Sequence, residues 1–140
     1  MNRPALALAA IFFAVPAYAQ PVQMEMCGRN QPNTPGKTCV VDGDTVWLHG
    51  QNLRLLDFDT PEPQTGICGG DFEVALATRA SARLLELLNS NDWAVETFGT
   101  DRYDRTLATI SIDGVDVGDI LIAEGLARHW PDGEEWWCDQ

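Results

Sequence analysis

Basic residues are scarce in this chain of 140 residues. Its 9 lysines and arginines stand against 21 aspartates and glutamates, which gives a formal net charge of −12. Proteins that bind polyanions through their overall field are positively charged, because counterion release and long-range attraction drive that binding. The composition therefore excludes polyanion binding by net charge alone. Any phosphate-binding site must take its positive charge from a few nearby arginines.

Apolar runs long enough to cross a membrane are also missing. The run ALALAAIFFAV, near the start of the chain, falls short of the roughly 20 residues that span a bilayer. It follows Arg3 and precedes Ala17-Tyr18-Ala19, the small-residue pattern of a cleavage site. We therefore expect residues 1–19 to be a secretory signal peptide, which leaves a secreted or periplasmic protein without a membrane span. Loss of Arg3 would leave 21 acids and 8 basic residues, a net charge of −13.

The cysteine patterns typical of zinc sites are absent as well. There is no Cys-x-x-Cys pair, and His49 and His129 have no ligand-like spacing to a cysteine. An even number of cysteines beyond the expected cleavage point favours two disulfides in an oxidising compartment. The four cysteines are Cys27, Cys39, Cys68 and Cys138. Of the three possible pairings, chain order favours Cys27 with Cys39 and Cys68 with Cys138.

Beyond residue 19 the sequence first predicts an arm and then strands. Proline, asparagine, glutamine and glycine predict an irregular arm over residues 20–37. Valine, leucine, threonine and aromatic residues are typical of strands, and Gly50 marks a hairpin turn between the first two. The predicted strands cover residues 38–48, 52–59, 92–99 and 106–112.

Two helices are expected between and after these strands. The first covers residues 72–90, where apolar side chains recur every four residues along one face. The second covers residues 117–127, with Asp116 as its N-cap and Gly125 near its end. This order of strands and helices favours a single small α+β domain built on a partly closed antiparallel barrel.

The first two predicted strands carry an unusual crowd of acids for β structure. Five carboxylates in so short a stretch raise one another's pKa values unless a cation or arginines offset their charge. Arg54 stands among them, but strict alternation places Arg54 and Asp59 on opposite faces of the strand. A shared site therefore requires a twist or a bulge between those two residues. The acids are Asp42, Asp44, Asp57, Asp59 and Glu62.

Four short segments of the chain are DGDT at 42–45, RLLDFDTPE at 54–62, TDRYDR at 100–105 and LIAEGLAR at 121–128. In their order and spacing these segments resemble the staphylococcal nuclease (thermonuclease) family, and the resemblance covers about residues 38–130. The resemblance implies an α+β fold, a five-stranded OB-fold-like antiparallel barrel with two to three helices, over residues 38–140.

The resemblance further implies one bound calcium ion. Its ligands are the carboxylates of Asp44 and Asp59 and the main-chain carbonyl of Thr60. This set suits the ion, because calcium is a hard cation that takes oxygen ligands and completes its shell with water and substrate phosphate.

The same resemblance assigns the catalytic groups. Glu62 falls at the position of a general base, or of a group that orients the attacking water. Arg54 and Arg105 match the pair that clamps the scissile phosphate, for which the two-pronged guanidinium is suited. Arg102 and Tyr103 are expected to bind substrate near a terminal phosphate, with a solvent-facing turn as the alternative for both.

The implied function is a secreted, monomeric, calcium-dependent nuclease that cleaves single-stranded DNA and RNA with little sequence preference, leaving 3′-phosphates. The alternatives are a nuclease-like module that binds nucleic acid without cleaving it and a disulfide-braced adaptor for an envelope protein. The sequence departs from the family after residue 130. There the segment DGEEWWCDQ, tied by Cys138, is expected to cover the core in place of a last helix.

Overall fold

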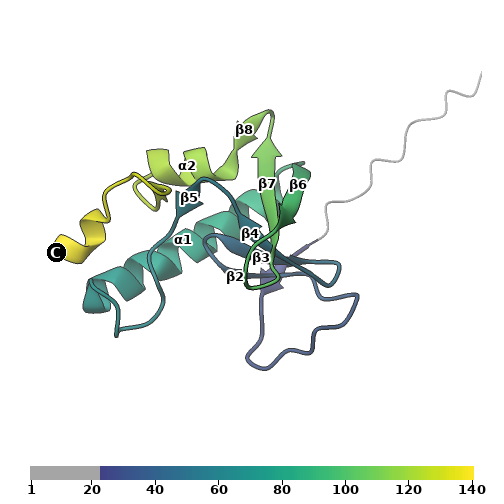
Figure 1. Ribbon diagram of the computed structural model, residues 1–140, viewed down its shortest axis with the longest axis horizontal. Helices are drawn as coiled ribbons and strands as arrows, with labels where there is room; N and C mark the ends of the chain where they lie inside the picture. The colour runs from purple at the N-terminus through teal and green to yellow at the C-terminus, as the bar shows by residue number, and fades with distance from the viewer. Residues whose placement is uncertain (1–22) are drawn as a thin grey trace, which may run out of the picture.

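The computed structural model describes residues 23–140 (Figure 1). The expected signal peptide, residues 1–19, lies outside the described residues. The helices are α1 (Gly70–Ser90), α2 (Val117–Ala123) and a final 3-10 helix, η1 (Trp136–Asp139). The strands are β1 (Glu25–Met26), β2 (Cys39–Asp42), β3 (Thr45–Leu48), β4 (Gln51–Leu55), β5 (Phe58–Asp59), β6 (Ala94–Thr100), β7 (Thr106–Ile112), β8 (Val115–Asp116) and β9 (Arg128–His129).

Seven strands form one sheet in the order β1-β2-β3-β4-β7-β6, with β8 paired to β7, while β5 and β9 form a separate antiparallel pair. The α+β class is confirmed, and β2, β3, β4, β6 and β7 are the five longer strands of the expected barrel. The sheet is mixed, since β1 runs parallel to β2 and β4 runs parallel to β7. Parallel pairing of β4 and β7 is possible because the long connection through α1 returns the chain to the same end of the sheet.

The core lies between the sheet and the two α-helices. The apolar stripe of α1 is confirmed, because its four predicted members are all buried: Leu76, Ala80, Leu84 and Leu88. Helix α1 packs against β2 and α2 (Figure 1). Asp116 caps α2 by accepting a hydrogen bond from Gly118 N at 2.7 Å, and Gly125 follows the helix at a φ of +70°. None of the helices within residues 23–140 has the length and apolar character that a membrane crossing requires.

Both ends of the described chain are tied to this core. The disulfides join Cys27 to Cys39 and Cys68 to Cys138, the pairing that chain order favours. Within the arm that was expected to be irregular, β1 pairs with β2, and the side chain of Met24 is buried in the core. At the other end, Trp137 in η1 is 1% exposed and joins the same core. The C-terminal segment therefore covers part of the core.

A break between β4 and β5 sets the geometry of the acidic stretch. Leu53 and Leu55 face the core, so strict alternation would also turn Asp57 and Asp59 inward. Instead Asp57 adopts a φ of +69° and is exposed, and Phe58 takes the next core position. This shift by one residue brings Asp59 to the side of the chain that carries Arg54. The irregularity that a shared site requires is present.

Candidate active site

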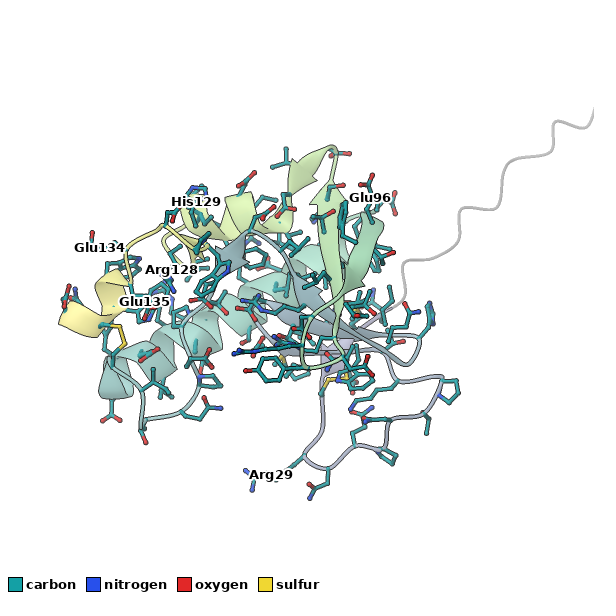
Figure 2. All side chains as sticks on the ribbon, in the orientation of Figure 1. Arg29, Glu96, Arg128, His129, Glu134 and Glu135 are labelled. Atoms are coloured by element: carbon teal, nitrogen blue, oxygen red, sulfur yellow. A yellow bond between two sulfur atoms is a disulfide. The ribbon has the colours of Figure 1, made fainter. Side chains whose placement is uncertain are left out.

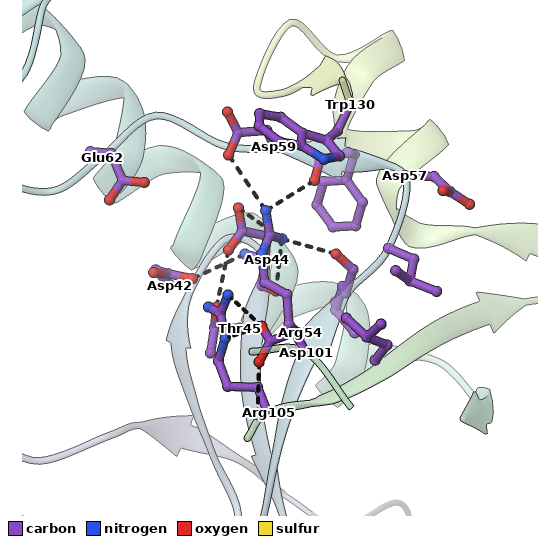
Figure 3. Close-up of a pocket in the computed structure, with 14 residues that line it drawn as sticks. Asp42, Asp44, Thr45, Arg54, Asp57, Asp59, Glu62, Asp101, Arg105 and Trp130 are labelled. Carbon is purple, nitrogen blue, oxygen red and sulfur yellow. Dashed lines mark hydrogen bonds and ion pairs between the residues drawn. The ribbon is translucent and has the colours of Figure 1, made fainter. Parts of the chain in front are cut away.

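Residues of the acidic stretch line a cavity of about 440 Å³ at the end of the sheet (Figure 3). Five of the predicted site residues line it: Asp44, Arg54, Asp59, Glu62 and Arg105. The other polar and aromatic residues of its lining are Asp42, Thr45, Asp57, Phe58, Asp101 and Trp130. Three predicted residues are not in this lining: Thr60, Arg102 and Tyr103. The fold thus gathers residues from β2, β4, β5 and the β6–β7 hairpin around one space.

Asp44 is the most enclosed carboxylate of the cavity, at 7% exposure. Its Oδ2 accepts hydrogen bonds from the main-chain N of Thr60 at 3.1 Å and from Thr60 Oγ1 at 3.2 Å. The turn that carries Asp44 approaches Thr60 closely, because a Cβ added at Gly43 would lie 2.6 Å from Thr60 Cγ2. Glycine at position 43 therefore lets the DGDT turn and the strand end at residue 60 meet.

Arg54 joins the two acidic segments. Its Nη1 lies 3.2 Å from Asp44 Oδ2, and its Nη2 lies 3.5 Å from Asp59 Oδ1. It also donates to the carbonyl of Leu55 at 2.9 Å, which fixes the plane of the guanidinium. Figure 3 shows Arg54 between the two aspartates, with Asp57 pointing elsewhere. One arginine thus offsets two of the crowded acids.

Arg128 also belongs to this site, although it was not among the residues predicted from the sequence. It is 9% exposed, and its Nε donates to Asp59 Oδ2 at 3.0 Å. Its Nη1 donates to the carbonyl of Gly133 at 2.7 Å, and its Nη2 pairs with Glu135 at 2.6 Å (Figure 2). Burial nevertheless raises the pKa of Asp59, against the lowering influence of Arg128 and Arg54. The only sequence signal was the position of Arg128 at the end of the LIAEGLAR segment.

Arg105 lies on the hairpin between β6 and β7. It forms a two-pronged pair with Asp101, with Nε and Nη2 each 2.8 Å from Asp101 Oδ2. Tyr103, on the same loop, is 64% exposed, and its hydroxyl accepts a hydrogen bond from Arg102 at 2.7 Å. Arg105 lines the cavity, whereas Arg102 and Tyr103 are exposed on the surface beside it.

The cavity holds more negative charge than its arginines neutralise. Arg105 is already paired with Asp101, which leaves Arg54 and the shared Arg128 to offset four carboxylates. Partial burial, followed by the charges of Asp44 and Asp59, raises the pKa of Glu62. Oxygen ligands with an excess of negative charge suit a hard divalent cation, so the residues present fit calcium. The four carboxylates are Asp42, Asp44, Asp59 and Glu62; Asp57 also lines the cavity but lies apart from them (Figure 3).

The excess charge predicts a pH-dependent stability in the absence of divalent cations. Burial, followed by the charge of Asp44, raises the pKa of Asp42 to about 7. In the unfolded chain this group has a pKa of about 3.9 and stays ionised near neutrality, so the folded state binds the extra proton. The free energy of unfolding should therefore increase as the pH falls, by about 1.4 kcal/mol from about pH 8 to about pH 6.

Urea unfolding at a series of pH values, with a chelator present, measures this dependence. Asn at position 42 can still accept the 3.2 Å hydrogen bond from the main-chain N of Asp44, which makes Asp42→Asn the matched control. We expect the variant to lose most of the slope. Equal slopes for the two proteins would contradict the prediction.

Comparison with known proteins agrees with the geometry. A sequence model of the family described as "Staphylococcal nuclease homologue" matches residues 52–135. Succinoglycan biosynthesis protein ExoI of Rhizobium meliloti (strain 1021) is 35% identical over 97 residues, 66% of this chain and 50% of that protein. The SPbeta prophage-derived endonuclease YokF of Bacillus subtilis (strain 168) is 36% identical over 96 residues, 63% of this chain and 31% of that protein.

Endonuclease YncB of Bacillus subtilis (strain 168) is also 36% identical over 96 residues, 63% of this chain and 44% of that protein. The matched part of the chain thus spans half or less of the length of these relatives. The family match includes Arg54, Asp59, Glu62 and Arg105, whereas Asp44 lies before it. Because the match covers more than half of the sequence, the chain belongs to the family of staphylococcal nuclease homologues.

Proposed function

We propose that this chain is a calcium-dependent nuclease that hydrolyses phosphodiester bonds in DNA and RNA with little sequence preference. The observation that carries the proposal is the cavity in which Arg54 and Arg105 face a group of carboxylates. Two relatives named as endonucleases support it. A module that only binds nucleic acid does not need Glu62 beside two arginines.

The arginines would bind the scissile phosphate and stabilise the charge that develops on its oxygens during attack. Arg105 would exchange part of its contact with Asp101 for the phosphate, whereas Arg54 already has its guanidinium fixed by Leu55 and the two aspartates. This difference suggests that Arg54 is organised before substrate binds. Arg105 would be drawn into place by the substrate.

Asp44, Asp59 and the carbonyl of Thr60 are the residues that would hold calcium. When bound, the ion supplies a Lewis acid for a phosphate oxygen and offsets the excess charge of the cavity. Glu62 would accept a proton from the attacking water, or orient that water, at its carboxylate. Its raised pKa suits proton transfer. Water would attack phosphorus and the bond to the 5′-oxygen would break, which leaves a 3′-phosphate and a 5′-hydroxyl.

The acidic surface shapes the proposed activity. With a formal charge of −12, the chain would attract nucleic acid only through local arginines, so cleavage should be sensitive to salt. The disulfides support an oxidising location, secreted or periplasmic. We further propose that the chain acts as a monomer, because all the residues assigned to the site lie in one chain.

The purified protein incubated with 5′-labelled single-stranded DNA provides the test. We expect cleavage with calcium and none with a chelator, because the crowded carboxylates cannot bind a phosphate without the cation. The products should change mobility on treatment with a 3′-phosphatase. RNA of the same length should also be cut.

Folded protein that leaves both substrates intact with calcium would refute the nuclease proposal. Retained affinity for single-stranded DNA in the chelator, without cleavage, would favour a binding module. The name of the relative ExoI refers to succinoglycan biosynthesis and not to nucleic acid, which keeps a non-catalytic role as the second candidate. A stable protein partner, unaffected by substitutions at Arg54 and Arg105, would support the adaptor role.

A further inference from the structure

A buried carboxylate outside the cavity contacts the main chain of Glu62. Glu73, in the first turn of α1, is 1% exposed. Its Oε1 accepts a hydrogen bond from Glu62 N at 3.1 Å, and its Oε2 accepts one from Gly69 N at 2.8 Å. Among residues 23–140 it has no ion-pair partner within 4.0 Å. Its bonds to main-chain N–H groups take the place of a cation.

Capping of α1 explains only one of these two bonds. A glutamate in the first turn commonly reaches back to the N–H that precedes the helix, as Glu73 does to Gly69. The helix N-terminus also favours a negative charge there. The bond to Glu62 N lies outside the helix, 11 residues away along the chain, and adds nothing to the capping. It connects the rigid end of α1 to the candidate catalytic segment.

Glu62 needs such an anchor because regular structure ends before it. The last strand there, β5, ends at Asp59, and residues 63–68 are exposed and belong to no helix or strand. A segment of this kind must lose conformational entropy to hold one catalytic side chain in place. The carboxylate of Glu73 binds the chain at both ends of this loop, at Glu62 and at Gly69. At the second end, a Cβ on Gly69 would lie 2.7 Å from Glu73 Cβ, so glycine permits the close approach.

We propose that Glu73 is a positioning residue for phosphodiester hydrolysis, because it fixes the main chain of Glu62 and so holds that carboxylate toward the cavity. The inference rests on the proposed function and deepens it. Glu73 touches neither the phosphate nor the water. It acts through Glu62 alone, so its loss should affect turnover more than substrate binding.

Glu73→Gln tests the proposal. Glu62 N and Gly69 N donate to different oxygens of Glu73, and glutamine replaces one of these oxygens with an NH₂ group. In the same side-chain position, one of the two main-chain N–H groups would then face a donor instead of an acceptor. We expect kcat to fall roughly 10- to 100-fold, the scale of a small misplacement of a catalytic group. KM should stay within about twofold, and calcium affinity measured by calorimetry should be unchanged. Asp71→Asn, which removes an exposed carboxylate from the same helix turn, should leave kcat unchanged.

A double-mutant cycle separates positioning from general destabilisation. If Glu73 acts through Glu62, adding Glu73→Gln to Glu62→Gln should lower kcat by less than about twofold further. If Glu73→Gln lowers kcat in the Glu62→Gln protein by as much as it does in the wild type, the proposal is overturned.

A second variant applies if Glu73→Gln does not fold. Glu73→Asp keeps two acceptor oxygens on a shorter side chain and should show the same loss of kcat. Wild-type kcat in a folded Glu73→Asp protein would contradict the proposal.

Amide hydrogen exchange gives a measurement that needs no activity. The amides of Glu62 and Gly69 should be protected in the wild-type protein, and at least one should exchange roughly 10-fold faster in Glu73→Gln. A Glu62 amide that exchanges as fast as an unbonded loop amide in the wild type would overturn the inference without any variant. If the wild type does not cleave nucleic acid, the proposed function fails, while the exchange data still decide whether Glu73 holds Glu62.

Discussion

Arg105→Ala is expected to lower kcat by about 10²- to 10³-fold, which corresponds to about 2.7–4 kcal/mol of lost transition-state stabilisation. Arg105 contributes little to the fold, because its side chain is 29% exposed and its ion pair is with Asp101 on the same loop. Its removal also leaves Asp101 as an unpaired negative charge beside the cavity. Both effects act on the bound phosphate. The measurement is steady-state cleavage of labelled single-stranded DNA at saturating calcium.

Arg79→Ala provides the control for charge. Arg79 is exposed on α1 and lies outside the cavity, so its removal makes the net charge more negative by the same amount as removal of Arg105. We expect it to change kcat by less than about twofold, because charges beyond a Debye length are largely screened at ordinary salt. Similar losses for the two variants would mean that Arg105 acts only through overall charge. The assignment of Arg105 to the phosphate would then be wrong.

Glu62→Gln is expected to reduce kcat by about 10²- to 10⁴-fold, the range for loss of a general acid–base group. The variant keeps the size of the side chain and removes its ability to accept a proton. If Glu62 is the base, the wild-type rate should increase with pH as its carboxylate ionises. Glu62→Gln should lose that limb of the profile.

The pH profile also separates the two roles that remain open for Glu62. A residue that only orients water would lower kcat when changed to glutamine but would leave the shape of the profile unaltered. Glu134→Gln, at an exposed position near the C-terminus, is the matched control and should behave as wild type. A Glu62→Gln protein with wild-type kcat would exclude Glu62 from the chemistry.

Much of the fold could be predicted from local patterns. The stripe of leucines and alanines predicted α1, Asp116 and Gly125 marked the limits of α2, and Gly50 marked the turn between β3 and β4. These features are set by interactions between residues close in sequence, such as side-chain periodicity and main-chain conformation. The two parallel strand pairs were not predicted, because the two-residue strand β1 lies in a segment of irregular composition and the pairing of β4 with β7 across the α1 connection leaves no local signal.

The sequence by itself determined which chemical groups the site contains. Asp44, Arg54, Asp59, Glu62 and Arg105 all belong to short motifs, so their residue types and order were readable, and all five line one cavity. Their roles as ligand, clamp and base remain predictions that the experiments above test.

Only the tertiary structure decided how these groups are held. The positive φ of Asp57 shifts the strand by one residue and turns Asp59 toward Arg54. Arg128 reaches Asp59 from 69 positions further along the chain, and Glu73 reaches Glu62 from the start of α1. These contacts depend on packing between elements distant in sequence. Periodicity and spacing describe only residues close together in the sequence. The residues that support the site could therefore be identified only from the tertiary structure.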